Sequence, residues 1–424
     1  MHRPLADAIL RTFDLQPEEA EIAMLASFPM GAWLDTYAWL DASGLALYFL
    51  DRVKTLRLQP CIPAAVLERL ERNFADNRER TADTFAEFVR INRAFTAAGV
   101  TFVNMKGITL VPEACEDPAL RLQLDIDVLI EMCQVQGCAV ALGELGYVLT
   151  VVSRQVWEFK AGSSRLPSVK DLYKAKPQRS VEVHFELAQQ PGELAARRDW
   201  ATLDGFSFPV LTAADRFIAQ AKHVLKHIRG EWTRLSWLLE FRHTVLHWKD
   251  DPPFWQQVRA RAAVDRELAT AIGSAIVLTT IAFGSFAPEE LACWTVDALD
   301  PHMRLWLDCY GQAAIMAEFP GTKLYLLQPE FTAAATGELP TLKRHRLMPL
   351  HRAPRIVHGA GEDGLRSRVA GWSAQSRFVL FRLRFHVTEG WRYLIEAPRW
   401  KRILAASAQS RPALLTATDE RGAV

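Results

Sequence analysis

The sequence lacks the features that mark several protein classes. Its 424 residues include only six cysteines, with no Cys-x-x-Cys pair and no zinc-like spacing. This argues against a disulfide-stapled or zinc-ribbon protein and favours the reduced thiols of a cytoplasmic protein. The first fourteen residues contain no apolar stretch of the kind found in a secretory signal. No apolar run reaches the ~18 residues of a membrane-spanning helix, and the run from Ile272 to Gly284 predicts a buried helix instead.

A strong net charge is also missing. The formal charge of the chain is +1, so no overall excess of positive charge demands a nucleic-acid partner, and we expect no DNA binding. The charge is unevenly distributed, however, because residues 341–424 contain 16 Lys and Arg but only 6 Asp and Glu. Half of the residues are hydrophobic and 23% are charged, which is a globular composition. The length suits two or three domains.

Changes of hydrophobic period divide the chain into regions. Residues 63–100 show apolar side chains at helical spacing, and Gly99 stands where a helix C-cap is usual. Strand and helix patterns then alternate over residues 100–190, and helical patterns return after Thr212, a predicted N-cap. We therefore expect an α+β fold: a small mixed β-sheet core with flanking helices, between N-terminal and C-terminal helical regions. The expected regions are 1–98 (helical), 99–210 (core), 211–320 (helical) and 321–424 (basic and rich in Pro, Arg and aromatic residues).

The core region contains four predicted strands and one helix. Each strand candidate is a short run of β-branched and apolar residues, and the helix candidate is closed by a glycine. The predicted strands are Val100–Gly107, Leu124–Met132, Tyr147–Val152 and Ser180–Leu187, and the predicted helix is Gly137–Tyr147.

Asp125 and Asp127 lie inside the apolar run "LDIDVLI". Residues i and i+2 of a strand project from the same face, so the two carboxylates are expected to point together. Carboxylates this close repel one another, and a divalent cation removes the conflict. Mg²⁺ prefers such oxygen ligands together with substrate phosphates. The alternative is a surface strand whose outer face is merely acidic.

Three neighbouring features favour a metal site. Lys106 and Gly107 end the preceding strand, where a cation and bare backbone amides can meet phosphates. Arg121 precedes Asp125 by four residues and is expected to bind or orient the same anions. The strand "VEVHF" offers Glu182 and His184 on one face, as a third acidic ligand or a general base. Phosphoryl and nucleotidyl transfer need this set of acids, cations and a base.

With these motifs the chain resembles the DNA polymerase beta-like nucleotidyltransferase superfamily. More closely, it resembles the bacterial uncharacterised nucleotidyltransferase family, in which a strand ending in Lys-Gly, an arginine, an Asp-Ile-Asp strand, a Gly-Tyr pair and an acidic-x-His strand follow one another. The matching pieces here are "VNMKG", Arg121, "DIDVLI", "LGY" and "VEVHFEL". The resemblance covers about residues 65–250.

The resemblance implies transfer of a nucleoside monophosphate from an NTP, with ATP as the default donor, dependent on one or two Mg²⁺ ions. Asp125 and Asp127 take the metal-binding positions, and Glu182 takes the third-carboxylate position, all three being catalytic. Lys106, Gly107 and Thr109 replace the superfamily's Gly-Ser phosphate loop, from which the sequence departs because Ile108 follows Gly107. The acceptor is expected to be a small molecule, a protein or an RNA that reacts through a hydroxyl or an amine.

The resemblance extends to a histidine-bearing helix that follows the core. Lys222, His223 or Arg234 is expected to reach the phosphates from above, and His184 is counted among the nucleotide-binding residues. Glu240 stands where the family often has aspartate, and a buried ion pair with Arg234 is expected for it.

A second hypothesis comes from another class of protein. The nucleotidyltransferase fold is then retained without catalysis, in a regulatory or scaffolding partner. The basic, aromatic segment of residues 342–404 would contact an anionic membrane surface or a partner protein, or fold back onto the acidic first 340 residues. Geometry separates the two hypotheses: in an enzyme the three carboxylates converge beside an open cleft, and in a scaffold they are covered or splayed.

Overall fold

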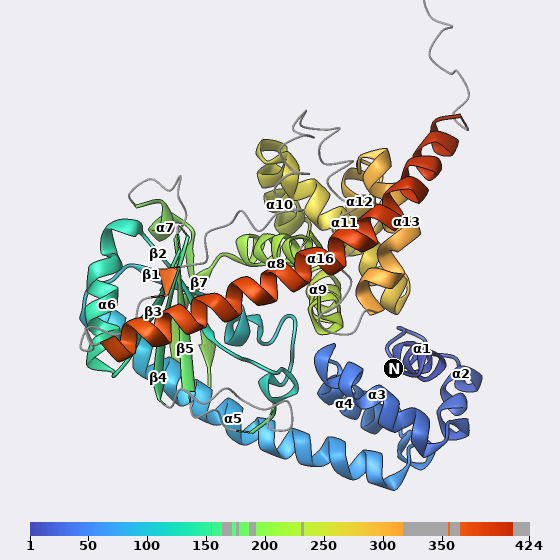
Figure 1. The fold of residues 1–424 in the computed structure, drawn as a ribbon, viewed down its shortest axis with the longest axis horizontal. Coiled ribbons are helices and arrows are strands. Elements are labelled where there is room, and N and C mark those ends of the chain that lie inside the picture. The colour runs from blue at the N-terminus through green and yellow to red at the C-terminus, as the bar shows by residue number, and fades with distance from the viewer. Residues whose placement is uncertain are drawn as a thin grey trace, which may run out of the picture.

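The computed structural model describes residues 1–153, 155–162, 172–174, 178–185, 192–229, 233–316, 355–356 and 365–409. A mixed β-sheet stands at one end of the molecule, with the N-terminal helices and a second block of helices at the other (Figure 1). The predicted α+β fold with a mixed sheet and flanking helices is therefore confirmed.

The N-terminal region is helical, as predicted, and ends in one long helix. Helix α5 has 34 residues and spans about 51 Å. Its end is a Schellman motif: Gly99 has φ +68°, its N–H donates to the Thr96 carbonyl at 3.1 Å, and the Val100 N–H donates to the Phe95 carbonyl at 3.0 Å. The elements are α1 (Arg3–Arg11), α2 (Glu19–Ala23), η1 (Met24–Ser27), α3 (Met30–Ala42), α4 (Ala46–Thr55), η2 (Gln59–Cys61) and α5 (Ala64–Ala97).

The sheet has eight strands in the order β6-β7-β1-β2-β5-β4-β3-β8. Strand β2 pairs antiparallel with β1 and parallel with β5, so the centre of the sheet is mixed. The strands are β1 (Phe102–Met105), β2 (Ile126–Ile130), β3 (Val148–Val152), β4 (Val156–Gly162), β5 (Gln178–Phe185), β6 (Arg198–Leu203), β7 (Phe206–Leu211) and β8 (Arg355–Ile356). The intervening helices are η3 (Gly107–Leu110), η4 (Pro118–Leu120), η5 (Met132–Gln134), α6 (Val135–Glu144) and α7 (Glu193–Ala196).

Four of these strands correspond to the four predicted runs, and four were not predicted. The β6–β7 hairpin turns at Asp204 and Gly205, which have φ +48° and +75°, as a type I′ turn requires. The Asp-Gly pair is a hairpin signal that the sequence analysis passed over. The two-residue β8 adds to the edge of the sheet at β3.

Alternation along the strands separates the two faces of the sheet. Ile126, Val128 and Ile130 of β2 belong to a buried cluster that includes side chains of α5 and α6. The residues between them on β2 therefore face the other way, together with the alternate residues of β5 and β4. One face of the sheet thus forms a large hydrophobic core. The other face carries polar groups beside a small buried apolar cluster of Val103, Leu129, Leu194 and Leu211.

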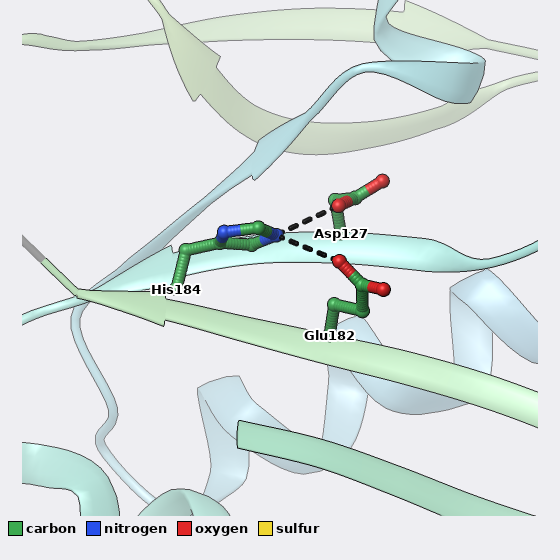
Figure 2. Close-up of side chains that lie close together, drawn as sticks. All are labelled: Asp127, Glu182 and His184. Atoms are coloured by element: carbon green, nitrogen blue, oxygen red, sulfur yellow. Dashed lines mark hydrogen bonds and ion pairs between the residues drawn. The ribbon is translucent and has the colours of Figure 1, made fainter. Parts of the chain in front are cut away.

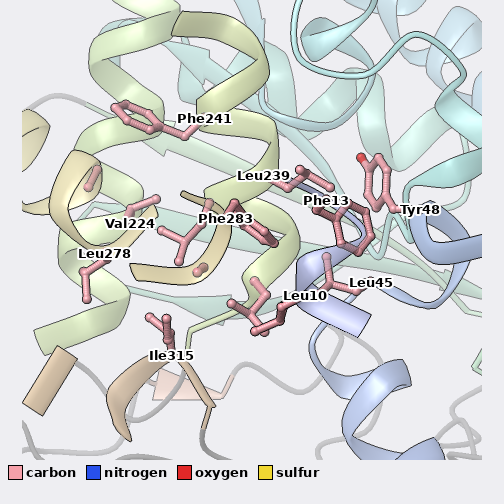
Figure 3. Close-up of a cluster of buried hydrophobic side chains, with 14 of the residues drawn as sticks. Leu10, Phe13, Leu45, Tyr48, Val224, Leu239, Phe241, Leu278, Phe283 and Ile315 are labelled. Carbon is pink, nitrogen blue, oxygen red and sulfur yellow. The ribbon is translucent and has the colours of Figure 1, made fainter. Parts of the chain in front are cut away.

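A second hydrophobic core joins both ends of the chain (Figure 3). Leu10 and Phe13 from the N-terminal helices lie with Phe241 and Phe283 from the later helices. The predicted buried helix of residues 272–284 lies in α11, and the predicted N-cap Thr212 accepts the Asp215 N–H at 3.3 Å. The helices are α8 (Ala213–Arg229), α9 (Leu235–His247), α10 (Pro252–Val264), α11 (Arg266–Phe283), α12 (Glu289–Thr295) and α13 (Pro301–Met316).

Helix α16 (Leu365–Gln409) crosses in front of the sheet and of α8 in the view of Figure 1. Its C-terminal part is anchored, since Trp400 is buried and contacts the Tyr310 ring at 5.9 Å. No helix in the described part of the chain is long and apolar enough to cross a membrane. Most of residues 342–364 lie outside the described residues, and membrane or partner contact of this segment stays a prediction. The exposed large apolar residues of α16 are Val369, Trp372, Val379, Leu380, Leu383, Val387, Trp391, Leu394 and Ile395.

Candidate active site

Strand pairing brings three polar side chains together on the open face of the sheet. Asp127 of β2 is in register with Glu182 of β5 on one side and with Met105, at the end of β1, on the other. His184 lies two residues beyond Glu182 on the same face of β5. The apolar residues of β2 fix the strand against α5 and α6, and this holds Asp127 in place between β1 and β5.

The distances define a compact cluster (Figure 2). His184 Nε2 lies 2.7 Å from Asp127 Oδ1 and 3.4 Å from Glu182 Oε2. One ligand atom from each of the three residues lies within 4.8 Å of the others. Two carboxylates and an imidazole at this spacing suit a divalent cation, the oxygens favouring Mg²⁺ or Mn²⁺ and the imidazole favouring transition metals. The donor set therefore fits the expected metal.

Lys106 completes the cluster from β1. Its ammonium donates to Asp127 Oδ1 at 2.6 Å. The backbone at Lys106 and Gly107 has φ +53° and +49°. A Cβ on Gly107 would lie 2.5 Å from the side-chain nitrogen of Gln123, so a larger residue would be strained and would displace that side chain. The Thr109 hydroxyl donates to the Lys106 carbonyl at 2.8 Å and braces the turn. The end of β1 is thus shaped to aim a cation at Asp127.

The charges in the cluster stabilise one another. Burial alone would raise the pKa of Asp127, but the charges and hydrogen bonds of Lys106 and His184 outweigh it and hold that pKa at about 2. Burial would lower the pKa of Lys106 and of His184, yet the Asp127 carboxylate raises both. Asp127 is therefore an anion held by the Lys106 ammonium and by its hydrogen bond with His184.

Asp125 lies just before β2 and has a different environment. It lines a separate cleft of about 850 Å³ against α5, together with Arg80, Glu87 and Arg179. Burial, reinforced by the negative charges of Asp127 and Glu182, raises the pKa of Asp125 to about 6. The two aspartates of the motif therefore differ: Asp127 is a paired anion and Asp125 is an acid close to its titration point.

We expect Asp125→Asn to stabilise the folded protein at pH 7 by about 1–3 kcal/mol. The pKa of Asp125 is about 6 in the folded chain against an ordinary value of 3.8, so the folded state holds an extra proton between these values. Stability is then lost as the pH rises through that window, and the neutral amide avoids the loss. Urea unfolding of wild type and variant from pH 4 to pH 7 measures the difference.

The control for this measurement is Asp199→Asn, which removes an exposed aspartate from edge strand β6. We expect that variant to follow the wild type at every pH. Parallel curves for wild type and Asp125→Asn would contradict the raised pKa.

The other predicted residues lie farther out. Glu240 Oε1 accepts from Arg121 Nε at 3.1 Å, so the expected pair with Arg234 is replaced by one with Arg121. Arg234 is buried at the start of α9, with its guanidinium 5.7 Å from the Trp237 ring centre. Lys222 forms an ion pair with Asp265 at 2.6 Å on an exposed surface. The structure thus gathers Lys106, Asp127, Glu182 and His184, with Gly107 and Thr109 behind them and Asp125 at the edge, and leaves Arg121, Lys222 and Arg234 outside the cluster.

The sequence analysis missed Glu158 on β4. It is in register with Glu182, accepts from Lys160 at 2.8 Å and from the Ser180 hydroxyl at 3.3 Å. The alternation in "VWEFKAG" is the signal that could have placed it on the polar face.

Three comparisons with known proteins were made. A crystal structure of an antigenic nucleotidyltransferase-like protein from Paracoccidioides brasiliensis is 9% identical, with 50% of this chain and 96% of that chain covered, at a TM-score of 0.29. Among curated proteins none matches. The family model described as "Uncharacterised nucleotidyltransferase" matches residues 29–284, which is more than half of the chain and contains the whole cluster. The chain therefore belongs to the uncharacterised nucleotidyltransferase family.

Proposed function

We propose that this protein transfers a nucleoside monophosphate from an NTP to a hydroxyl or amine of an acceptor, in a reaction that depends on a divalent cation. The observation that carries the proposal is the convergence of Asp127, Glu182 and His184 beside Lys106. Nucleotidyl transfer needs carboxylates that bind a metal ion, a cation that binds phosphates and a carboxylate within reach of the acceptor.

The roles proposed for the residues follow the order of the strands. Lys106 and Gly107 directly follow β1, and there the cation and the tight turn would receive the phosphates. Asp127 on β2 and Glu182 on β5 would hold Mg²⁺, with His184 as a further ligand or an orienting hydrogen-bond partner and Asp125 nearby. When bound, the ion would neutralise phosphate charge and align the donor.

The chemical step is an in-line displacement. The acceptor oxygen or nitrogen forms a bond to the α-phosphorus, the bond from that phosphorus to the bridging oxygen breaks, and pyrophosphate leaves. Glu182 accepts the acceptor's proton. The side chains of Glu182 and Lys106 are 31% and 30% exposed, whereas that of Asp127 is 3% exposed, so the cluster is open to solvent beside β5 and beside Lys106. This open approach favours catalysis over a scaffold with covered acids.

The test is a transfer assay with the full chain. Each of the four NTPs, labelled on the α-phosphate, is incubated with Mg²⁺ or Mn²⁺ and with small metabolites, tRNA or lysate protein as acceptor. We expect label from at least one α-labelled NTP to enter an acceptor, and no label from the same NTP labelled on the γ-phosphate. Binding of NTP without transfer under any of these conditions would favour the scaffolding alternative.

A further inference from the structure

A second cavity opens beside Lys106, at the β1 side of Asp127, whereas Glu182 lies on the β5 side. We propose that this cavity binds the nucleobase of the donor nucleotide, with Trp237 as an apolar wall and Gln220 as the hydrogen-bond acceptor for an amino group on the base. The proposal rests on the proposed function, because it names the part of the donor that this site recognises.

The position of the cavity fits a nucleotide anchored at Lys106. The cavity lies between the end of β1, the turn η3 and helices α8 and α9. Lys106 itself forms part of the wall, and its ammonium lies 2.6 Å from Asp127. A donor whose phosphates meet Lys106 therefore has a cavity next to it for the other end of the molecule.

Strand β2 lies between this cavity and the acidic residues of β5 and β4. The strand order places β1 on one side of β2 and β5 and β4 on the other. Glu182 and Glu158 lie on β5 and β4, while the cavity is reached from β1. A carboxylate that takes a proton belongs near the acceptor, so the opposite side of Asp127 is left for the donor.

The chemistry of the wall suits a flat, neutral ring. Leu110, Leu211 and Val224 give it an apolar surface. The two arginines that line the cavity, Arg121 and Arg216, are paired with Glu240 and Glu113, so their charges are already neutralised.

Two aromatic side chains of the wall lie against each other. The imidazole of His223 lies 4.5 Å from the Trp237 ring, centre to centre. Burial, with the nearby His227, lowers the pKa of His223 well below its ordinary value, so that ring is neutral. An aromatic wall of this kind offers stacking to a planar base.

Gln220 points to the kind of base. Its side-chain oxygen is buried, and it has no hydrogen-bond partner among the described residues. Buried acceptors are normally satisfied, so an unpaired one in a cavity wall calls for a donor from a ligand. The exocyclic amines of adenine, cytosine and guanine are such donors, whereas uracil carries a carbonyl in place of the amine. The cavity is therefore expected to prefer an amino-bearing base.

The test compares ligands that share everything except the base. Calorimetry with Mg²⁺ measures binding of the α,β-methylene analogues of ATP, CTP, GTP and UTP, and of inorganic triphosphate. We expect at least one amino-bearing analogue to bind at least tenfold more tightly than both the UTP analogue and triphosphate. Gln220→Leu should remove this preference, and Ala219→Phe, which fills the cavity, should reduce every analogue to the affinity of triphosphate. Triphosphate itself should bind equally to all variants.

The matched control is Gln257→Leu, the same substitution at an exposed position of α10, which should leave the preference intact. Circular dichroism confirms that each variant is folded. If the wild type binds triphosphate and all analogues equally, or if Gln220→Leu and Ala219→Phe keep the preference, the inference is overturned and the proposed function stands. If the wild type binds neither triphosphate nor any analogue, the proposed function fails and the inference fails with it.

Discussion

Asp127→Asn is expected to lower the rate of nucleotidyl transfer by about 100- to 1,000-fold. A metal ion contributes several kcal/mol of charge stabilisation in such reactions, and each 1.4 kcal/mol corresponds to about a factor of ten. Asp127 is the one residue that contacts both Lys106 and His184 within the cluster, and it is buried. Its carboxylate is therefore the group whose loss disconnects the β1 and β5 sides of the site. Transfer of α-labelled NTP at saturating Mg²⁺ measures the effect.

Two further variants make this experiment decisive. The double variant Asp125→Asn/Asp127→Asn should abolish Mg²⁺-dependent binding and transfer altogether. Asp199→Asn removes the same charge from an exposed strand position and should behave like the wild type. Transfer by the double variant at the wild-type rate would show that the aspartates do not carry the chemistry.

Glu240→Ala is expected to destabilise the protein by about 3–5 kcal/mol, because it leaves the largely buried guanidinium of Arg121, 16% exposed, without its counter-ion. The Glu240 carboxylate accepts from Arg121 at 3.1 Å and from the Tyr48 hydroxyl at 3.0 Å. These three residues come from α9, from the segment before β2 and from α4, so one carboxylate ties together three distant parts of the chain. Urea unfolding at pH 7 gives the change in the free energy of unfolding.

The matched control is Glu68→Ala, which breaks an exposed ion pair with Arg72 on α5. Exposed pairs of this kind contribute about 0–1 kcal/mol, so the control should lie close to the wild type. Equal midpoints for Glu240→Ala and Glu68→Ala would refute a structural role for the Glu240 network.

The parts of the site that lie close together in the sequence could be predicted from it. The two-residue period of a strand places Glu182 and His184 on one side of β5. The same period predicted Asp125 and Asp127 on one side of a strand, but Asp125 precedes β2. Local pattern could not show that Asp127 is held between Lys106 and His184 while Asp125 faces a separate cleft. That difference arises because Asp127 lies within β2, opposite the end of β1, and Asp125 precedes the strand.

Contacts between distant segments account for what the sequence did not reveal. Arg121 meets Glu240 across 119 residues of chain. The cavity wall combines the end of β1 with side chains of α8 and α9, over a hundred residues later. Neither the choice of partner nor the empty space follows from spacing along the chain, since both depend on how α8 and α9 pack on the sheet.

Helix α5 connects the N-terminal helices to the segment that precedes β2. The helix contacts α4. Its middle forms two hydrogen bonds with the segment that leads into β2. Asn77 donates to the Ala119 carbonyl at 2.7 Å, and Arg80 donates to the carbonyl of Gln123, two residues before Asp125. Because α5 is one continuous helix of 34 residues, these two contact regions belong to the same element. The position of the segment that carries Asp125 is therefore fixed relative to the N-terminal helices by a single helix.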